Sequence, residues 1–400
     1  MADSEKISRR TALAIGGAAA AGLTVGASTG VAAERLLGGA SVPFEDIAAE
    51  KYDFFGEHQR GIAEAPQAFA NLVAFNLLSD SDGEAIGRLL RLWTSDISLL
   101  MAGRGAMADS NAEIAATTAG LTITVGLGYE CFVRAGKPYE WPLAAMEVPA
   151  YRKIDQLEPA WVGGDLFLQV CANDALTVSH AVRELTKSAA PFASLHWVQR
   201  GFSTPPNVNP GETPRNLMGQ FDGSANPRPN SPEFDFSVWS RGERHPWFEG
   251  GTSVAIRRIR MQLDTWEEMQ PSDQELVIGR NRRNGAPLTG RLERDKPDFN
   301  AKDESGEFVI PIDAHIRRAS NAQKIFRRPY NYDDGFNSAG VNDVGQLFIT
   351  YQAELQQYFQ IQSVLAELDS LNKWTTPVGS AVFAILPGVE RGDYLGSAVF

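Results

Sequence analysis

The sequence of 400 residues contains only two cysteines and five histidines. Two cysteines exclude a scaffold stapled by several disulfides and leave open a single bridge between Cys131 and Cys171. Both lie in apolar runs that read as strands, where they fit as small buried hydrophobic residues. No Cys-x-x-Cys-His sequence occurs, so a covalently attached c-type haem is not indicated.

Motifs of several other enzyme classes are also absent. The chain has no His-Glu-x-x-His and no Cys-x-x-Cys, which argues against a zinc protease and a dithiol site. Residues 103–108 (GRGAMA) resemble a dinucleotide-binding fingerprint. They follow an expected helix instead of a strand, so we reject that interpretation.

Positive charge is in deficit. Lys and Arg number 37 against 49 Asp and Glu, which gives a net charge of -12 and a pI near 5.0. This balance argues against nucleic acid as a partner. The hydrophobic content of 43% suits a globular chain with ample core, of a length for two or three domains or two fused halves.

The N-terminus has no long leucine-rich run. Residues 8–13 (SRRTAL) form a twin-arginine pattern, followed by an Ala- and Gly-rich stretch to Ala33. This pattern predicts a signal peptide over residues 1–33 and export by the twin-arginine machinery to the periplasm or extracellular space. A membrane anchor is the less favoured alternative, because the stretch is only weakly hydrophobic.

The rest of the chain divides at a proline-rich connector, residues 204–214. In the first half we expect strands at 68–78, 120–128, 165–172 and 194–202, and helices at 82–101 and 174–189. In the second half we expect strands at 252–263, 346–352 and 380–386, helices at 265–279 and 354–374, and a long polar insertion at 281–343. Two halves of similar order predict an α+β fold with antiparallel sheets.

Residues 216–227 (NLMGQFDGSANP) place one carboxylate, Asp222, within a glycine-containing turn. Glycine permits close approach of the backbone to a ligand, so the acid would be presented and not packed. An ordinary Asp-Gly turn is the alternative.

A second candidate group lies in the polar insertion, where His315 is followed twelve residues later by Arg327 and Arg328. A lone histidine suits the iron of a haem. An acid and a guanidinium on the opposite side suit peroxide, whose cleavage needs a moved proton and a stabilised charge. By spacing alone, a loop histidine and a surface charge run remain the alternative.

These segments together resemble the dye-decolorizing peroxidases, a family of haem peroxidases, of the exported twin-arginine type. The resemblance spans the mature chain and rests on residues 55–62 (FGEHQRGI), 164–166 (GDL), 213–227 (TPRNLMGQFDGSANP), 278–280 (IGR), 285–290 (GAPLTG), 314–317 (AHIR) and 327–328 (RR). It implies two ferredoxin-like halves, residues 34–205 and 215–400, with the haem pocket in the C-terminal half.

The resemblance also implies the cofactor and the site. One non-covalent haem b per chain would be held by His315 as the metal ligand. Asp222 and Arg327 would be catalytic, and the cofactor-binding residues would be Gly223, Ser224, Ala225, His315, Arg327 and Phe348. Gln346 stands where the family usually has an apolar residue, and Glu354 is a candidate partner for His315, with helix capping as its alternative.

The implied activity is reduction of hydrogen peroxide and one-electron oxidation of bulky aromatic donors. Since aspartic acid in water titrates near pH 4, such a base predicts activity skewed to acidic pH. Candidates for surface electron transfer are Trp239, Trp247, Tyr330 and Tyr332. The alternative function is a haem-binding protein that handles haem or releases its iron, and a homo-oligomer is compatible with either.

Overall fold

The computed structural model describes residues 44–400, apart from 206–207, 209–210, 322 and 337–339. The expected signal peptide, residues 1–33, lies outside the described residues. The chain divides into two units, Met1–Asp46 and Ile47–Phe400. Helix α2 spans Phe44–Ala49, and every later element belongs to the second unit.

The N-terminal half contains four antiparallel strands in the order β2-β3-β1-β4. They are β1 (Phe69–Leu77), β2 (Thr122–Leu127), β3 (Leu166–Ala172) and β4 (Ala193–Phe202). The helices are α3 (Gly83–Met101), α4 (Tyr129–Arg134) and α5 (Ala175–Ala189), with short 3-10 turns η1 (Ile114–Ala116), η2 (Pro138–Glu140) and η3 (Pro159–Trp161). This strand order is that of a ferredoxin-like unit.

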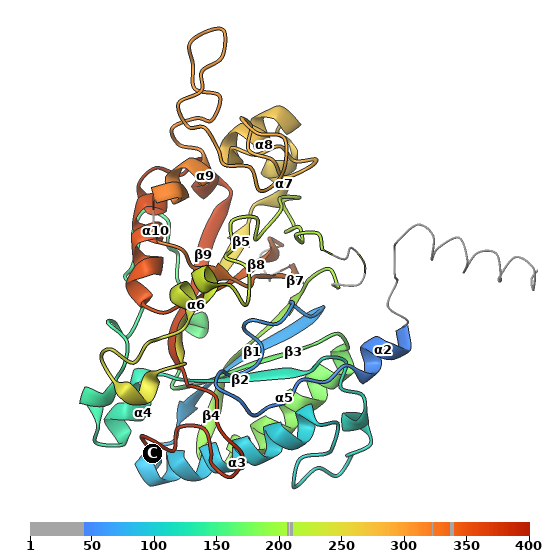
Figure 1. Cartoon of the computed structure of the whole chain (residues 1–400), viewed down its shortest axis with the longest axis vertical. Helices are drawn as coiled ribbons and strands as arrows, with labels where there is room; N and C mark the ends of the chain where they lie inside the picture. Colours follow the sequence, from blue (N-terminus) through green and yellow to red (C-terminus); the bar gives the residue numbers. More distant parts are fainter. Residues whose placement is uncertain (1–43, 206–207, 209–210, 322, 337–339) are drawn as a thin grey trace, which may run out of the picture. The chain divides into compact units, whose positions relative to one another are not determined.

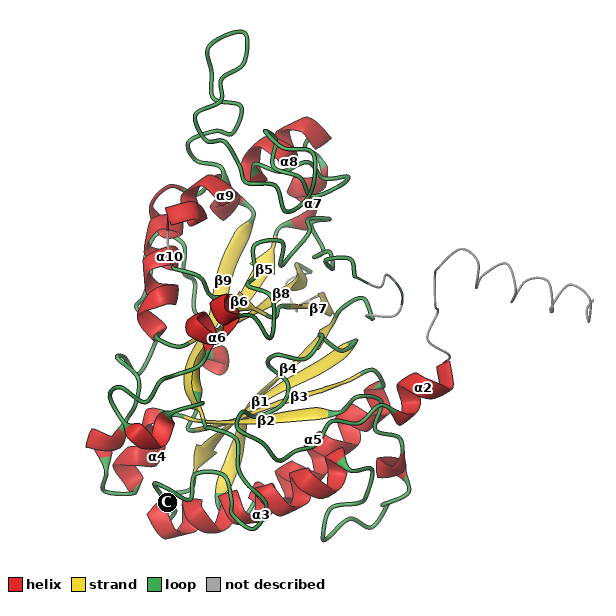
Figure 2. Cartoon of the chain, viewed as in Figure 1, coloured by secondary structure: helices red, strands yellow, loops and turns green. Residues whose placement is uncertain are grey.

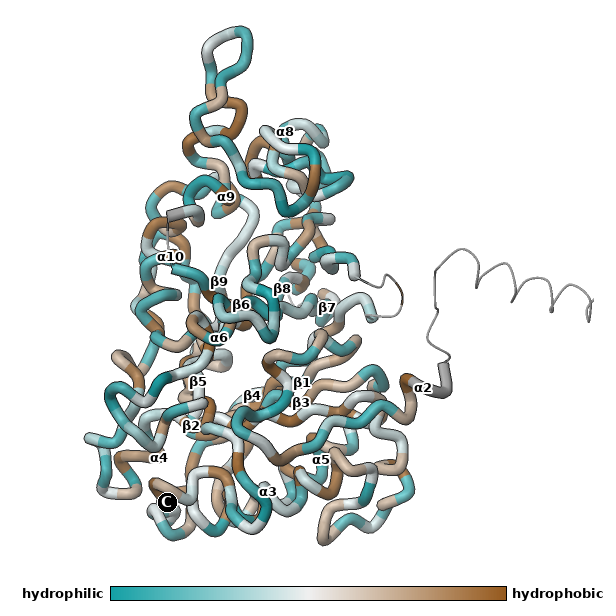
Figure 3. Tube along the Cα trace, viewed as in Figure 1, coloured by the Kyte–Doolittle hydropathy of each residue, from teal (hydrophilic) through white to brown (hydrophobic). Residues whose placement is uncertain are grey.

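The two long helices of this half begin where the sequence places capping aspartates. Asp82 accepts from the backbone N–H of Ala85, and Asp174 accepts from that of Thr177. Figure 3 shows hydrophilic and hydrophobic residues alternating along α3 and α5, as expected of helices with one buried face. Figure 2 shows that both helices lie against the same face of the strands.

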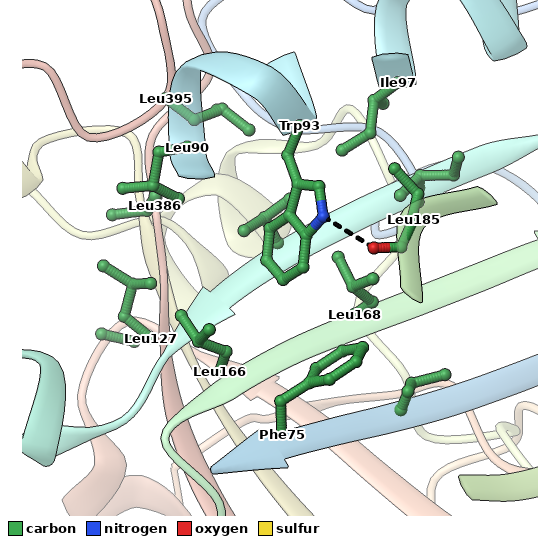
Figure 4. Packing of buried hydrophobic residues seen from close by; sticks show 14 of the residues in the cluster. Phe75, Leu90, Trp93, Ile97, Leu127, Leu166, Leu168, Leu185, Leu386 and Leu395 are labelled. Atoms are coloured by element: carbon green, nitrogen blue, oxygen red, sulfur yellow. Dashed lines mark hydrogen bonds between the residues drawn. The ribbon is translucent and has the colours of Figure 1, made fainter. Parts of the chain in front are cut away.

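The core of the N-terminal half is centred on Trp93 of α3. Its side chain is fully buried, and its indole N–H donates to the carbonyl of Leu185 of α5 at 3.1 Å (Figure 4). The residues around it in Figure 4 are Phe75, Leu90, Ile97, Leu127, Leu166, Leu168, Leu185, Leu386 and Leu395. Apolar side chains of the strands and of both helices thus form one core cluster.

The C-terminal half repeats the strand order, here β9-β5-β8-β7. Its strands are β5 (Thr252–Met261), β6 (Phe326–Arg327), β7 (Tyr330–Phe336), β8 (Asn342–Gln352) and β9 (Thr375–Ile385). Its helices are α6 (Pro232–Val238), α7 (Leu263–Glu267), α8 (Pro271–Ile278), α9 (His315–Arg318) and α10 (Leu355–Leu368), with η4 (Pro246–Phe248), η5 (Ala319–Asn321) and η6 (Ser370–Lys373).

The two halves share one sheet. Strand β2 pairs with β9, β4 pairs with β7, and β5 pairs with both β8 and β9, so the strand order closes on itself (Figure 1). No helix among the described residues has the length and apolar character needed to cross a membrane. The boundaries 34–205 and 215–400 stay a prediction.

Several expected elements differ from the structure. The helix expected over 265–279 is two helices, α7 and α8, because Pro271 has no N–H to continue a helix and starts a new one. Cys131 lies in helix α4 and not in a strand, and both cysteines are buried free thiols. The polar insertion contains the strand β7, whose Asp333, Asp334 and Gly335 hid its pattern.

Candidate functional site

One face of strands β6, β7 and β8 carries polar side chains. Directly paired residues of antiparallel strands point to the same side, and the pairs here are Arg327 with Thr350 and Asn331 with Gln346. The alternate residues of β8 (Leu347, Ile349 and Tyr351) are buried in the apolar core. Phe348 lies two residues from Gln346, so it shares the polar face, where its ring is 6.3 Å from that of Tyr358 in α10.

The loop that carries Asp222 is fixed to this face by Asn331. The Asn331 side-chain oxygen accepts from the N–H of Leu217, and its amide lies 3.4 Å from the carbonyl of Arg215. Gly219 and Gly223, with φ of 78° and 124°, provide the two backbone conformations that side chains disfavour. The turn therefore places Asp222 beside Gln346 of β8.

Asp222 lies between Arg327 and Gln346. The Gln346 amide donates to Asp222 Oδ2 at 2.6 Å, and Arg327 Nη1 is 3.3 Å from Asp222 Oδ1. The Arg327 contact is an ion pair without hydrogen-bond geometry, so the buried Oδ1 has no hydrogen-bond partner among the described residues. One carboxylate oxygen is thus fixed, and the other is left to act on a ligand.

Two neighbouring contacts decide which arginine of the pair faces Asp222. Asn226 donates to the carbonyl of Arg327 at 2.6 Å and accepts from its N–H at 3.1 Å, which fixes the backbone of β6. Arg328 points to the opposite side, fully buried, where it donates to Gln67 and to the carbonyls of Glu64 and Ala65. Arg327 therefore belongs to the site, whereas Arg328 joins the two halves.

His315 is the first residue of the short helix α9. Its Nδ1 lies 2.7 Å from Oδ2 of Asp369, whose side chain is 3% exposed. Within the described part of the chain, His315 Nε2 has no hydrogen-bond partner, and the side chain is 26% exposed. A buried acceptor at Nδ1 fixes the ring and directs Nε2 away from it, as in histidines that bind a metal.

Of the two alternatives for Glu354, partner of His315 or helix cap, the structure shows the helix cap. Glu354 caps α10, since its side chain accepts from the backbone of Gln357 and the Gln357 side chain accepts from the N–H of Glu354. Asp369 can reach His315 because α10 ends at Leu368, six residues before the expected helix end at 374. No periodic pattern in the sequence marks this helix end.

One small hydrophobic cluster connects helix α9, which carries His315, with the loop that carries Asp222. Met218 of the loop is buried with Trp266 of α7, whose indole donates to the Met218 carbonyl, and Ile316 packs against the same cluster. Gly279, with φ of 87°, allows Ile316 to approach, because a Cβ there would lie 2.7 Å from the isoleucine side chain. The next residue, Arg280, thereby lies near Arg327.

Arg280 and Arg327 are close enough to repel each other. Burial, together with the positive charge of Arg327, lowers the pKa of the Arg280 guanidinium from its ordinary value. Arg280 donates to the carbonyls of Gly285 and Glu293, and Asp222 is the carboxylate paired with Arg327. Two guanidiniums here favour an anionic ligand.

The residues fit a haem. His315 offers Nε2, and two guanidiniums suit the propionate carboxylates. Asp222 Oδ1 and Ser224 Oγ are buried polar atoms that lack a hydrogen-bond partner in the part of the chain that the structure describes. Gly223 is half-buried and Ala225 is exposed in the same turn. Phe348, half-buried on the shared face, would supply an apolar wall.

Two family models match the chain. "Dyp-type peroxidase, N-terminal" matches residues 59–203, and "Dyp-type peroxidase, C-terminal" matches residues 213–390. A dye-decolorizing peroxidase of Thermobifida fusca (strain YX) is 36% identical over 415 residues, which cover 97% of this chain and 96% of the relative. A deferrochelatase of Shigella sonnei (strain Ss046) is 35% identical over 377 residues, or 88% of each chain.

Solved structures agree with these matches. The crystal structure of a DyP-type peroxidase from Cellulomonas bogoriensis is 45% identical, with a TM-score of 0.84 over 88% of this chain and 98% of that chain. The chain belongs to the Dyp-type peroxidase family. It is therefore a haem peroxidase, and the predicted fold of two ferredoxin-like halves with antiparallel sheets is confirmed.

Sequence reasoning missed three residues of this site. Asn226 was part of the quoted motif, but nothing in the sequence shows that it holds β6. Asn331 and Asp369 lie far along the chain from the residues they contact. Only the folded chain brings them together, so no local pattern could reveal them.

Proposed function

We propose that the enzyme reduces hydrogen peroxide at a haem b bound by His315, one per chain, and oxidises bulky aromatic donors in one-electron steps. The observation that carries this proposal is the arrangement of Asp222, with Oδ2 fixed by Gln346 and Oδ1 left beside Arg327. In the balanced reaction, hydrogen peroxide takes two electrons and two protons to form two water molecules. Two donor molecules each lose one electron and one proton.

Asp222 Oδ1 is the atom that would carry the proton. Haem supplies the redox-active iron when it is bound. Oδ1 would take a proton from one peroxide oxygen and return it to the other, which becomes water. Arg327, fixed through Asn226, would stabilise the negative charge that develops on the departing oxygen.

His315 and Asp369 would hold the cofactor. The buried Asp369 carboxylate makes the imidazole a stronger ligand and keeps its ring in one orientation. Gly223, Ser224, Ala225 and Phe348 would line the bound haem, and Arg280 and Arg327 would offer positive charge to its propionates. Because the chain has no Cys-x-x-Cys-His, this haem would be non-covalent.

The test separates binding from turnover. Asp222→Asn and Arg327→Leu should bind haem with a wild-type Soret band and lose most peroxide turnover, whereas His315→Ala should lose or loosen haem. Absorption spectra before and after one equivalent of hydrogen peroxide measure both properties. A wild-type protein whose Soret band is indifferent to peroxide would contradict the proposal.

Among the aromatic candidates for electron transfer, Trp239 is the best supported, because its ring, although only 7% exposed, lines a hollow. Tyr330 and Tyr332 are buried strand residues, 1% and 0% exposed, and not loop residues as expected from the sequence. Trp239 stacks on His58 with ring centroids 3.8 Å apart, at a hollow of about 290 Å³. Both residues line this hollow, so a bulky donor could bind there.

Ring contacts connect this hollow with the site. Trp239 lies 5.9 Å from Phe234, and Phe234 lies 5.0 Å from Phe326, the residue before Arg327. Trp239→Phe should slow bulky donors and spare small ones. Trp247→Phe is the matched control. Trp247 is half-buried, and its indole N–H donates a hydrogen bond to Glu140. Equal effects of Trp239→Phe on both donor classes would reject the route.

Release of iron from haem is the second candidate function, because a relative of 35% identity is named a deferrochelatase. The paired Asp222 and Arg327 favour the peroxidase, since a haem carrier needs no acid beside a guanidinium. Products formed after haem loading distinguish the two. Intact porphyrin without iron would support the second function, and oxidised donor with retained haem would support the first.

Export is proposed from the sequence alone. Residues 8–13 (SRRTAL) would direct the chain to the twin-arginine machinery, which transports it to the periplasm or extracellular space. Arg9→Lys with Arg10→Lys should retain the protein in the cytoplasm, as measured by fractionation. Unchanged export of this variant would contradict the proposal.

A further inference from the structure

A group of metal-ligating side chains lies in the N-terminal half, on elements that carry none of the peroxidase residues. His180 and Glu184 are one helical turn apart on α5, so both project from one face of that helix. Asp109 approaches them from the loop between α3 and η1. Among the described residues, this is the one group of three His, Cys, Asp or Glu whose ligand atoms all lie within 4.8 Å of one another.

The ligand atoms are nearly shielded from solvent. Oδ2 of Asp109 is 2.8 Å from Nε2 of His180, and the exposed side-chain fractions are 0% for Asp109 and 6% for His180. The Glu184 side chain is 3% exposed. Three ligands around a tetrahedral zinc ion, with bonds of about 2.1 Å, lie about 3.4 Å apart. The 2.8 Å contact and the 4.8 Å limit of this group lie on either side of that ligand-to-ligand distance.

The surroundings hold more negative than positive charge. A third carboxylate, Asp96 of α3, is 3% exposed and accepts from the N–H of Met107, but it takes part in no ion pair of the described residues. Of the lysines and arginines that the structure describes, only Lys187 forms an ion pair with the group, through Glu184 at 2.7 Å. Three buried carboxylates with one ammonium are costly unless further positive charge is supplied.

We propose that Asp109, His180 and Glu184 bind one divalent transition-metal ion of the Zn²⁺ class, with water as the fourth ligand. An imidazole with two carboxylates suits Zn²⁺ better than Ca²⁺ or Mg²⁺, which prefer six or more oxygen ligands. The ion would supply the charge that the carboxylates lack. It would also cross-link the loop of Asp109 to α5, far along the chain from the peroxidase residues.

Lys187 competes with the ion in this arrangement. Its Nζ lies 2.7 and 3.0 Å from the two oxygens of Glu184, so binding must displace it. The Lys187 side chain is 46% exposed and can turn into solvent. Lys187→Met would thus remove the competitor while keeping all three ligands, and it should bind the ion more tightly than the wild-type chain does.

The test is calorimetric titration of Zn²⁺ into the full haem-loaded chain after chelator treatment. The wild type should bind one ion per chain, and His180→Gln should weaken binding by more than the 10- to 100-fold that loss of an outer partner typically costs. Lys187→Met should tighten it and increase the rise in Tm that Zn²⁺ produces. His245→Gln, a histidine beside Glu140 elsewhere in the chain, is the matched control and should change nothing.

Several results would overturn the inference. One is unchanged Zn²⁺ binding in His180→Gln, which would indicate another surface site. Equal binding of Mg²⁺ would indicate simple charge attraction to the carboxylates. If His180→Gln fails to fold, Lys187→Met still decides, because unchanged or weaker binding there contradicts a site that includes Glu184.

Discussion

The two halves of the chain have the same strand order but different covers on their sheets. In the N-terminal half, helices of 19 and 15 residues, α3 and α5, pack an apolar layer around Trp93. In the C-terminal half, the helix after β5 is broken into α7 and α8 of 5 and 8 residues, and a long loop leads to α9. The sheet there keeps a polar face with Arg327 and Gln346.

The same strand order can thus support either a packed apolar core or a polar ligand site. Long amphipathic helices exclude water and ligands from a sheet, whereas short helices and loops leave room for both. The polar insertion supplies His315 and Arg327, and Arg280 lies directly before it. Function thus lies in the connections between strands and not in the strand order.

The largest expected effect is in the packed half. Trp93→Ala should lower the free energy of unfolding by about 3–5 kcal/mol, because it leaves a large cavity and removes the bond to Leu185. Denaturant unfolding measures this change. Leu176→Ala, at a 60% exposed position of α5, is the control and should change it by less than about 0.5 kcal/mol. Similar values for both would contradict the packed core.

Next in size is the contrast between the two adjacent arginines. Arg327→Leu should lower kcat/KM for hydrogen peroxide by about 10²- to 10³-fold with little change in stability. Arg328→Leu should instead destabilise the fold, because the acceptors on Glu64, Ala65 and Gln67 lose their donor. Peroxide kinetics and thermal unfolding of both variants measure this. The reverse pattern would exchange the two roles.

Asp369→Asn should weaken haem retention by about 10- to 100-fold, because the neutral amide supports the imidazole less well than the carboxylate does. The rate at which haem passes to apomyoglobin measures retention. Glu354→Gln is the matched control, and its only expected effect is a small loss of helix stability. Equal haem loss in both variants would mean that Asp369 has no special role.

The smallest effect is expected at Gln346. Gln346→Leu should lower peroxide turnover by about 5- to 10-fold, which corresponds to about 1 kcal/mol for a lost hydrogen bond to Asp222. Gln346→Glu should be worse, since two carboxylates would then share one buried place. Turnover of both variants under saturating donor measures this. If Leu equals the wild type and Glu does not, the amide contributes only by being uncharged.

The sequence predicted helices and strands best where regularly spaced apolar residues or a capping aspartate mark them. Asp82 and Asp174 marked the starts of α3 and α5, and alternating apolar residues marked β2. It failed where a polar strand depends on its neighbours. Strand β7 carries Asp333 and Asp334 and is held by pairing with β8, a contact that local propensity does not register.

The family, the two-half fold and the candidates Asp222, His315 and Arg327 could be predicted from the sequence, because short motifs and local periodicity lie in consecutive residues. The tertiary structure decided which arginine faces the acid, since strand alternation sends Arg327 and Arg328 to opposite sides. It also decided that Asp369 and not Glu354 supports His315. These contacts join residues 54 to 261 positions apart, and they form because the folded chain packs those residues together.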